Sequence, residues 1–151
     1  MTTISASRPS ELEPPRLWSL GRLLGRLVLG AFFGFAGLGH FFARDAFTAQ
    51  VPPWMPFTDA VIYVSGVIEI AFALALFFAP ARWRPRLGWV LAAFLVVIFP
   101  GNISQYVNDR DQFGMTSDGA RLARLFFQPV FVAWALWCTG AWATYREGRA
   151  R

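Results

Sequence analysis

The stretch Val64–Phe78 reads VSGVIEIAFALALFF, and the interpretation of the whole chain depends on it. It is apolar at almost every position, yet the carboxylate of Glu69 lies near its middle. The surrounding block Phe57–Ala79 is long enough for the roughly 20 residues that cross a membrane as a helix. An acid at the centre of such a span costs roughly 2.5–3.5 kcal/mol. We therefore expect Glu69 to have a partner or a proton.

Three further blocks have the same apolar character. The chain has 151 residues and is 56% hydrophobic, above the roughly 45–50% that is usual for soluble domains. The four blocks are Leu17–Ala43, Phe57–Ala79, Leu87–Val107 and Leu122–Thr144. This pattern predicts an all-α protein that forms a membrane-spanning antiparallel four-helix bundle.

The ends of the chain are more polar than these blocks. We expect residues 1–16 to be a disordered cytoplasmic tail, residues 17–145 to be the four-helix transmembrane domain and residues 146–151 to be a cytoplasmic C-terminal tail. The first apolar block is too long for a secretory signal and has no A-x-A-like cleavage site, so we expect it to be retained as a span.

The basic residues are distributed unequally between the two sides of such a bundle. All fourteen are arginine, and if the spans alternate in direction, ten lie on one side. The ten are Arg8, Arg16, Arg22, Arg26, Arg82, Arg84, Arg86, Arg146, Arg149 and Arg151, against Arg44, Arg110, Arg121 and Arg124. The positive-inside rule then predicts a multi-pass protein of the cell inner (plasma) membrane with both termini cytoplasmic. The arginines flank apolar blocks and form no stripe with interleaved aromatics, so the pattern does not favour nucleic-acid binding.

The first span contains small residues at helical spacing. Gly30 and Gly34 form a small-xxx-small pair that Gly37 extends by one turn, which predicts close packing of a neighbouring helix. Arg22 and Arg26 lie near the start of this span, and we expect both to extend toward the inner headgroups.

Prolines predict interruptions in the other spans. In the outer loop Arg44–Pro56, the prolines are expected to stop any helix. The third span has thirteen residues before Pro100, or about 20 Å of helix, against a hydrocarbon core of about 30 Å. The segment PGNISQY is therefore expected to be irregular backbone inside the outer part of the membrane, with Asn102 lining a cavity. Pro129 predicts a kink in the fourth span.

The rare polar residues of the four spans fall in one half of the predicted bundle. Glu69 lies about 18 Å below the start of its span, near mid-membrane. The others lie between it and the outer surface, and the candidate ligand-binding set is His40, Ser65, Glu69, Asn102, Arg121, Arg124 and Gln128. The arginines could neutralise Glu69, or a protonated Glu69 could donate a hydrogen bond to Gln128 or Asn102.

Two interpretations of this set are open. The polar residues either hold the helices in register through hydrogen bonds, or they line a pocket that binds a small molecule or relays protons. Several chemistries are not indicated. The single cysteine, Cys138, excludes a disulfide within the chain, one histidine excludes bis-histidine haem ligation, and no cluster has metal-ligand spacing. No catalytic residue is identified.

Five short motifs occur in order along the spans: GLGHFF (37–42), VPPWMP (51–56), SGVIEI (65–70), FPGNI (99–103) and RLARLFFQP (121–129). Their order and spacing resemble the DoxX family of small bacterial membrane proteins. The resemblance implies a four-helix membrane bundle, with His40, Glu69, Asn102, Gln128 and either Arg121 or Arg124 at the positions of the family's pattern. It also implies a link to membrane-associated redox complexes, since the family is named after a subunit of a thiosulfate:quinone oxidoreductase.

The leading hypothesis from the sequence is a subunit or accessory of a membrane redox complex with a polar pocket in the outer half of the bilayer. No redox centre of its own is evident, so any oxidoreductase role requires a partner chain or a bound molecule such as a quinone or another small apolar ligand. The alternatives are a non-enzymatic membrane scaffold and a small-molecule transporter.

Overall fold

The regular structure of the described chain is helical throughout. A computed structural model describes residues 16–108 and 117–150, and it contains no β-strand within them. In chain order the helices are α1 (Arg16–Phe42), α2 (Arg44–Thr48), α3 (Thr58–Phe78), the 3-10 turn η1 (Ala81–Trp83), α4 (Arg84–Val107), α5 (Asp118–Cys138) and α6 (Ala141–Arg149). The expected all-α class is confirmed.

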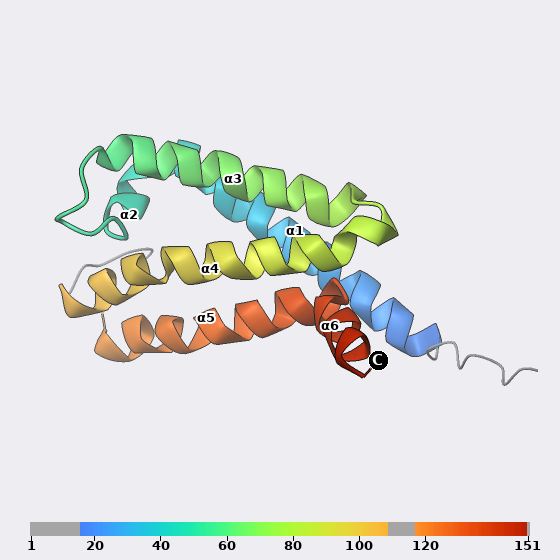
Figure 1. The fold of residues 1–151 in the computed structure, drawn as a ribbon. Helices are drawn as coiled ribbons and strands as arrows, with labels where there is room; N and C mark the ends of the chain where they lie inside the picture. The colour runs from blue at the N-terminus through green and yellow to red at the C-terminus, as the bar shows by residue number, and fades with distance from the viewer. Residues whose placement is uncertain (1–15, 109–116, 151) are drawn as a thin grey trace, which may run out of the picture.

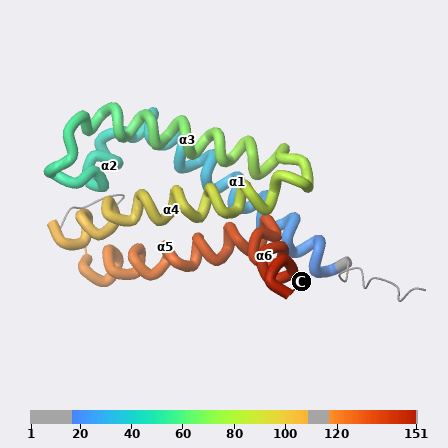
Figure 2. The backbone as a smooth tube through the Cα atoms, in the orientation of Figure 1, coloured from blue at the N-terminus to red at the C-terminus, as the bar shows by residue number. Residues whose placement is uncertain are grey.

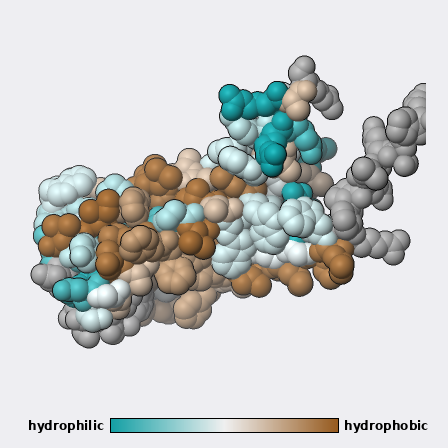
Figure 3. Space-filling view, turned by 90° about the horizontal axis from the view of Figure 1, so that it is seen from below, coloured by the Kyte–Doolittle hydropathy of each residue, from teal (hydrophilic) through white to brown (hydrophobic). Residues whose placement is uncertain are grey.

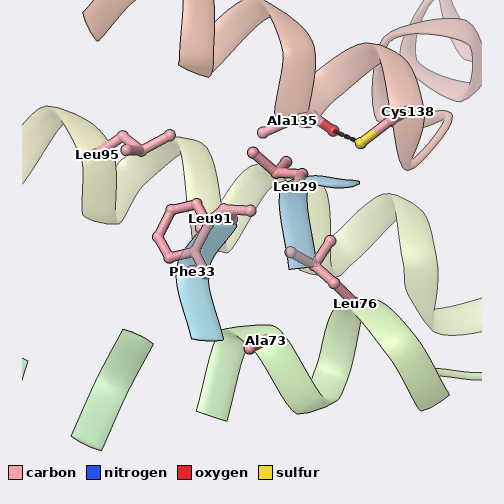
Figure 4. Close-up of a cluster of buried hydrophobic side chains, with 8 residues drawn as sticks. All are labelled: Leu29, Phe33, Ala73, Leu76, Leu91, Leu95, Ala135 and Cys138. Atoms are coloured by element: carbon pink, nitrogen blue, oxygen red, sulfur yellow. Dashed lines mark hydrogen bonds between the residues drawn. The ribbon is translucent and has the colours of Figure 1, made fainter. Parts of the chain in front are cut away.

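The four long helices pack chiefly as two pairs, α1 with α3 and α4 with α5 (Figure 1). Figure 2 shows that successive long helices reverse their direction. All four contribute to one apolar core, two side chains each (Figure 4). The core consists of Leu29, Phe33, Ala73, Leu76, Leu91, Leu95, Ala135 and Cys138.

The glycines of α1 form its contact with α3, as the sequence predicts. A Cβ atom at Gly30 would lie 3.2 Å from the Phe77 ring, and one at Gly37 would lie 2.9 Å from the backbone oxygen of Gly66. Gly66 is equally constrained, because a Cβ there would lie 3.0 Å from the Gly37 oxygen. The two backbones therefore touch at Gly37 and Gly66, a spacing that only glycine allows.

The helix α4 passes through Pro100 without a break, so the expected irregular backbone over PGNISQY is wrong. Proline removes one backbone donor, but the helix continues to Val107. With 24 residues, α4 is about 36 Å long and needs no irregular segment to match a hydrocarbon core of about 30 Å. Gly101 allows the loop after α2 to approach, since a Cβ there would lie 2.7 Å from the Gln50 oxygen.

The fourth apolar block is bent, whereas the sequence predicts a span up to Thr144. The helix α5 ends at Cys138, and the hydroxyl of Thr139 donates a hydrogen bond of 2.7 Å to the Ala135 carbonyl. Gly140 adopts a positive φ of 78°, and α6 then leaves at 70° to α5. Residues 146–149, expected as a tail, belong to α6.

The loop after α1 also contains a helix that the sequence does not predict. The short α2 ends at Thr48, four residues before the first proline of the loop. Phe47 and Val51 of this region pack on Ile62 of α3 in a second apolar cluster. Arg44 donates hydrogen bonds to Asp59 at the start of α3 and to Asp45, so the loop is bound to α3. These bonds, above all the one to Asp59, raise the pKa of Arg44.

Arg26 does not extend toward the headgroups as predicted. Its side chain is buried, and its guanidinium donates to the carbonyls of Leu76 and, at 3.3 Å, Phe77. The last carbonyls of a helix have no intrahelical donor, so Arg26 satisfies the end of α3. The nearby Arg84 donates at 3.1 Å to the Ala79 carbonyl just beyond that end.

The described arginines lie mainly at one end of the helices, where α1 begins, α3 joins α4, and α6 lies (Figure 1). This end carries Arg16, Arg22, Arg26, Arg82, Arg84, Arg86, Arg146 and Arg149, and the opposite end carries Arg44, Arg121 and Arg124. The predicted tail at residues 1–15, Arg110 in the predicted outer loop and Arg151 lie outside the described residues.

Two matched glycine substitutions test whether the backbone contact between α1 and α3 sets the spacing of these helices. Gly37→Ala places a methyl group against the backbone of α3, which forces the helices apart and should lower the free energy of unfolding by about 1–3 kcal/mol. Gly34→Ala, one turn earlier, meets only the Ala73 methyl group at 3.5 Å and should be close to neutral. Thermal unfolding of the purified protein in detergent compares the two. Equal effects would show that this backbone contact does not set the helix spacing.

Candidate functional site

The seven candidate residues lie in the interior or at its edge. His40, Glu69, Asn102, Arg121 and Gln128 are buried, and Ser65 and Arg124 are half-buried. Four of them form contacts within a helix pair. His40 lies next to Glu69 between α1 and α3, and Asn102 binds Gln128 between α4 and α5.

His40 of α1 and Glu69 of α3 lie next to each other. The distance from His40 Nε2 to Glu69 Oε2 is 3.5 Å, and the imidazole lies against the Phe47 ring at a tilt of 31° and a centroid distance of 3.8 Å. The contact follows from the helix spacing, because a Cβ at Gly66 would lie 2.7 Å from the His40 Cβ. A histidine of the neighbouring helix therefore lies next to Glu69, for which the sequence predicts a partner or a proton. Ser65 lies one turn before Glu69 in α3.

The His40–Glu69 contact is longer than an ordinary hydrogen bond of about 2.7–3.2 Å. His40 Nδ1 and Glu69 Oε2 are both buried and have no hydrogen-bond partner within the described part of the chain. Buried polar atoms are nearly always paired, so unpaired ones mark a place where a proton, water or ligand group could bind.

Among the candidate arginines, Arg124 interacts electrostatically with Glu69. This interaction connects α3 to α5 and so relates the two helix pairs. Arg121 binds Asp118 one turn earlier in its own helix, with Nη2 2.6 Å from the carboxylate.

Asn102 and Gln128 bind each other. Asn102 Nδ2 donates to Gln128 Oε1 at 2.8 Å, and Gln128 Nε2 donates to the backbone carbonyl of Leu95. Both amides are buried, and the bonds tie α4 to α5. Neither residue is hydrogen-bonded to Glu69, which the sequence left open as an alternative.

Gln105 is a buried residue that the sequence analysis missed. It is 1% exposed, and its Nε2 has no hydrogen-bond partner among residues 16–108 and 117–150. It lies three residues after Asn102, so both share one face of α4. The three-residue spacing from Asn102 could have predicted a buried Gln105. It was overlooked because irregular backbone, not a helix, was expected after Pro100.

A groove of about 780 Å³ runs along α5 and is lined mainly by apolar and aromatic side chains. We call it the α5 groove; its walls include Val96 and Phe99 of α4, Leu125 to Trp137 of α5, and Trp142 of α6. Gln128 lines it about midway along α5, whereas Arg22 of α1 and Arg146 of α6 make up its basic end. Of the seven candidate residues, only Gln128 lines this groove.

Within residues 16–108 and 117–150, no three His, Cys, Asp or Glu side chains form a group that could hold a metal ion.

These features define an all-helical protein with several helices of membrane-spanning character. Leu17–Phe42, Thr58–Phe78 and Ala81–Val107 are long and apolar enough to cross a membrane, and α5 with α6 also qualifies if the bent pair counts as one span.

The chain belongs to a family described as a domain of unknown function (DUF8561), whose model matches residues 29–139. The identification with the DoxX family is therefore wrong, and the redox link that it implied loses its support. Motifs of five to nine residues, rich in the glycine, phenylalanine and proline that membrane helices share, carried that resemblance. No curated protein and no solved structure matches the chain.

The amide pair can be tested by a double-mutant cycle. Gln128→Leu leaves Asn102 buried without its partner and should cost about 1–3 kcal/mol of unfolding free energy. Replacing both residues by leucine should cost less than the sum of the two single changes, because no amide is then left unpaired. Denaturation in detergent measures the coupling, and strictly additive effects would contradict a direct interaction.

Proposed function

We propose that the protein crosses a membrane four times as an antiparallel bundle, with both termini in the cytoplasm and α5–α6 as the bent fourth span. Hydrophobic residues cover much of the face in Figure 3, between hydrophilic patches toward its two ends. The apolar helices and the concentration of arginines at one end support this arrangement. An inner (plasma) membrane location belongs to the same proposal.

The orientation is tested by cysteine labelling in a Cys138→Ala background. Asn108→Cys lies at the end of α4 on the proposed outer side, and Arg86→Cys lies near its start on the proposed cytoplasmic side; both positions are exposed. In right-side-out membrane vesicles, a membrane-impermeant maleimide should label position 108 and leave position 86 unlabelled until detergent is added. Labelling of position 86 alone would reverse the orientation, and equal labelling before detergent would refute this membrane topology.

We infer that the function of this bundle is to bind a small apolar molecule with a polar head in the α5 groove. The observation that carries this proposal is the groove itself: its volume of about 780 Å³ lies within the roughly 300–1,000 Å³ of small-molecule sites. Its apolar walls suit a chain or a ring, and Gln128 and the two arginines provide polar groups at separate positions. A quinone is one candidate of this class.

The buried polar residues support a second role for the same helices, as a scaffold. Asn102 and Gln128 satisfy each other across α4 and α5, and His40 lies against Glu69 across α1 and α3. Such contacts penalise any rotation or sliding of a helix, because a displaced polar group would be unpaired in apolar surroundings. The expected redox-enzyme partner and the transporter alternative stay predictions.

Filling the groove tests the binding proposal. Ala133→Trp places an indole in the groove wall, and Ala93→Trp makes the same change at an exposed position of α4 outside the lining. Protein in mild detergent is mixed with decylubiquinone or with a single-chain phospholipid. A ligand at tenfold its Kd stabilises the native state by about 1.4 kcal/mol. We expect at least one probe to raise the Tm of wild type and of Ala93→Trp by a few degrees, and to leave Ala133→Trp unchanged.

Mass spectrometry of molecules extracted from the purified protein provides a second measurement. Wild type and Ala93→Trp should retain a small amphipathic molecule that Ala133→Trp lacks. If no probe shifts the Tm and no such molecule is extracted, the proposed function is wrong.

A further inference from the structure

The basic end of the α5 groove combines two guanidinium groups. Arg22 and Arg146 both line the groove, and among residues 16–108 and 117–150 no acidic side chain lines it. The two arginines come from α1 and α6, so the bend at Gly140 that turns α6 away from α5 creates this end of the groove.

Arg22 is held in place from one side. Its guanidinium lies over the Trp18 ring at 5.6 Å, and Trp18 in turn packs edge-on against Trp137 at a centroid distance of 6.3 Å. The Nε atom of Arg22 is buried without a hydrogen-bond partner within the described part of the chain. A buried donor of a cation without an acceptor favours an anionic group at this position.

The dimensions of the groove match one leaflet of a bilayer. Along α5 the lining extends from Trp137 to Leu125, and twelve residue steps correspond to about 18 Å. Half of a hydrocarbon core of about 30 Å is about 15 Å. A chain anchored at the two arginines would therefore extend along Val132 and Pro129 to the level of Gln128, near the middle of the membrane.

We propose that the α5 groove holds an anionic phospholipid of the cytoplasmic leaflet, with its phosphate between Arg22 and Arg146 and an acyl chain along α5. This inference rests on the proposed function and specifies its ligand. Arginine suits the role because its planar guanidinium donates two parallel hydrogen bonds to one phosphate. Trp18, Trp137 and Trp142, which line the same end, suit the level of the lipid headgroups.

The experiment compares phospholipids that have the same acyl chains and different heads. The full chain in mild detergent is mixed with equal amounts of phosphatidylglycerol and phosphatidylcholine, and native mass spectrometry counts the lipids retained. Wild type should retain phosphatidylglycerol preferentially. The double variant Arg22→Gln/Arg146→Gln should lose roughly tenfold or more of that preference, given the roughly 1 kcal/mol per basic residue near a charged headgroup. Arg149→Gln, on α6 outside the lining, is the matched control and should behave as wild type.

Two further variants keep the outcome interpretable. Arg22→Lys/Arg146→Lys retains the charge and should keep most of the preference, so a loss confined to the glutamine variant reports the charge of the two side chains. Ala133→Trp should reduce retention of both phospholipids, and undiminished phosphatidylglycerol on this variant would place the lipid elsewhere and overturn the inference.

Failure of this inference differs from failure of the proposed function. Equal retention of the two lipids by wild type, or an unchanged preference in the glutamine variant, would reject the anionic lipid. If decylubiquinone still stabilises wild type but not Ala133→Trp, the groove remains a binding site for another head group. If Ala133→Trp alters the binding of no probe, both proposals are wrong.

Discussion

The close approach of two glycine backbones, Gly37 of α1 and Gly66 of α3, is the constraint on which the arrangement of the buried polar residues depends. With a Cβ at either position, the helices would have to separate by several tenths of an ångström or more. At the observed spacing, the side chain of His40 lies over Gly66 and reaches Glu69 in the next turn of α3. Phe47 of α2 lies against the imidazole, with a centroid distance of 3.8 Å.

The helix packing also distributes the buried polar residues over separate contacts. The polar contacts lie within the two helix pairs, His40 with Glu69 and Asn102 with Gln128, and the Glu69–Arg124 interaction relates one pair to the other. The α5 groove lies to one side of these contacts and remains mostly apolar. Its mouth depends on α6, whose bend at Gly140 brings Arg146 to the same end as Arg22. Gln128 belongs to both, because it binds Asn102 and also lines the groove, whereas His40, Glu69, Asn102 and Arg124 lie outside the lining.

Hydrophobic periodicity and composition predicted the four long helices, but they did not predict where the helices end or which residues they contact. The four apolar blocks correspond to α1, α3, α4 and α5, and the glycine face of α1 was predicted because small residues at helical spacing have few other uses in an apolar helix. Pro100 misled the prediction for α4, since the loss of one donor does not end a helix that packs well on both sides of it. Arg26 was misplaced because the carbonyls that it binds belong to a helix end fifty residues further along the chain.

By itself the sequence determined that this protein is helical, that the helices are apolar enough to cross a membrane, and that Glu69 requires a partner or a proton. These properties follow from local hydrophobicity and from the cost of burying a charge, which any segment carries wherever it packs. Only the tertiary structure decided that the partner is His40, that Asn102 and Gln128 satisfy each other, and that Arg22 and Arg146 meet at one end of an apolar groove. Those pairings depend on the rotation and spacing of helices distant in sequence, which contacts such as that between Gly37 and Gly66 set and which no local pattern specifies.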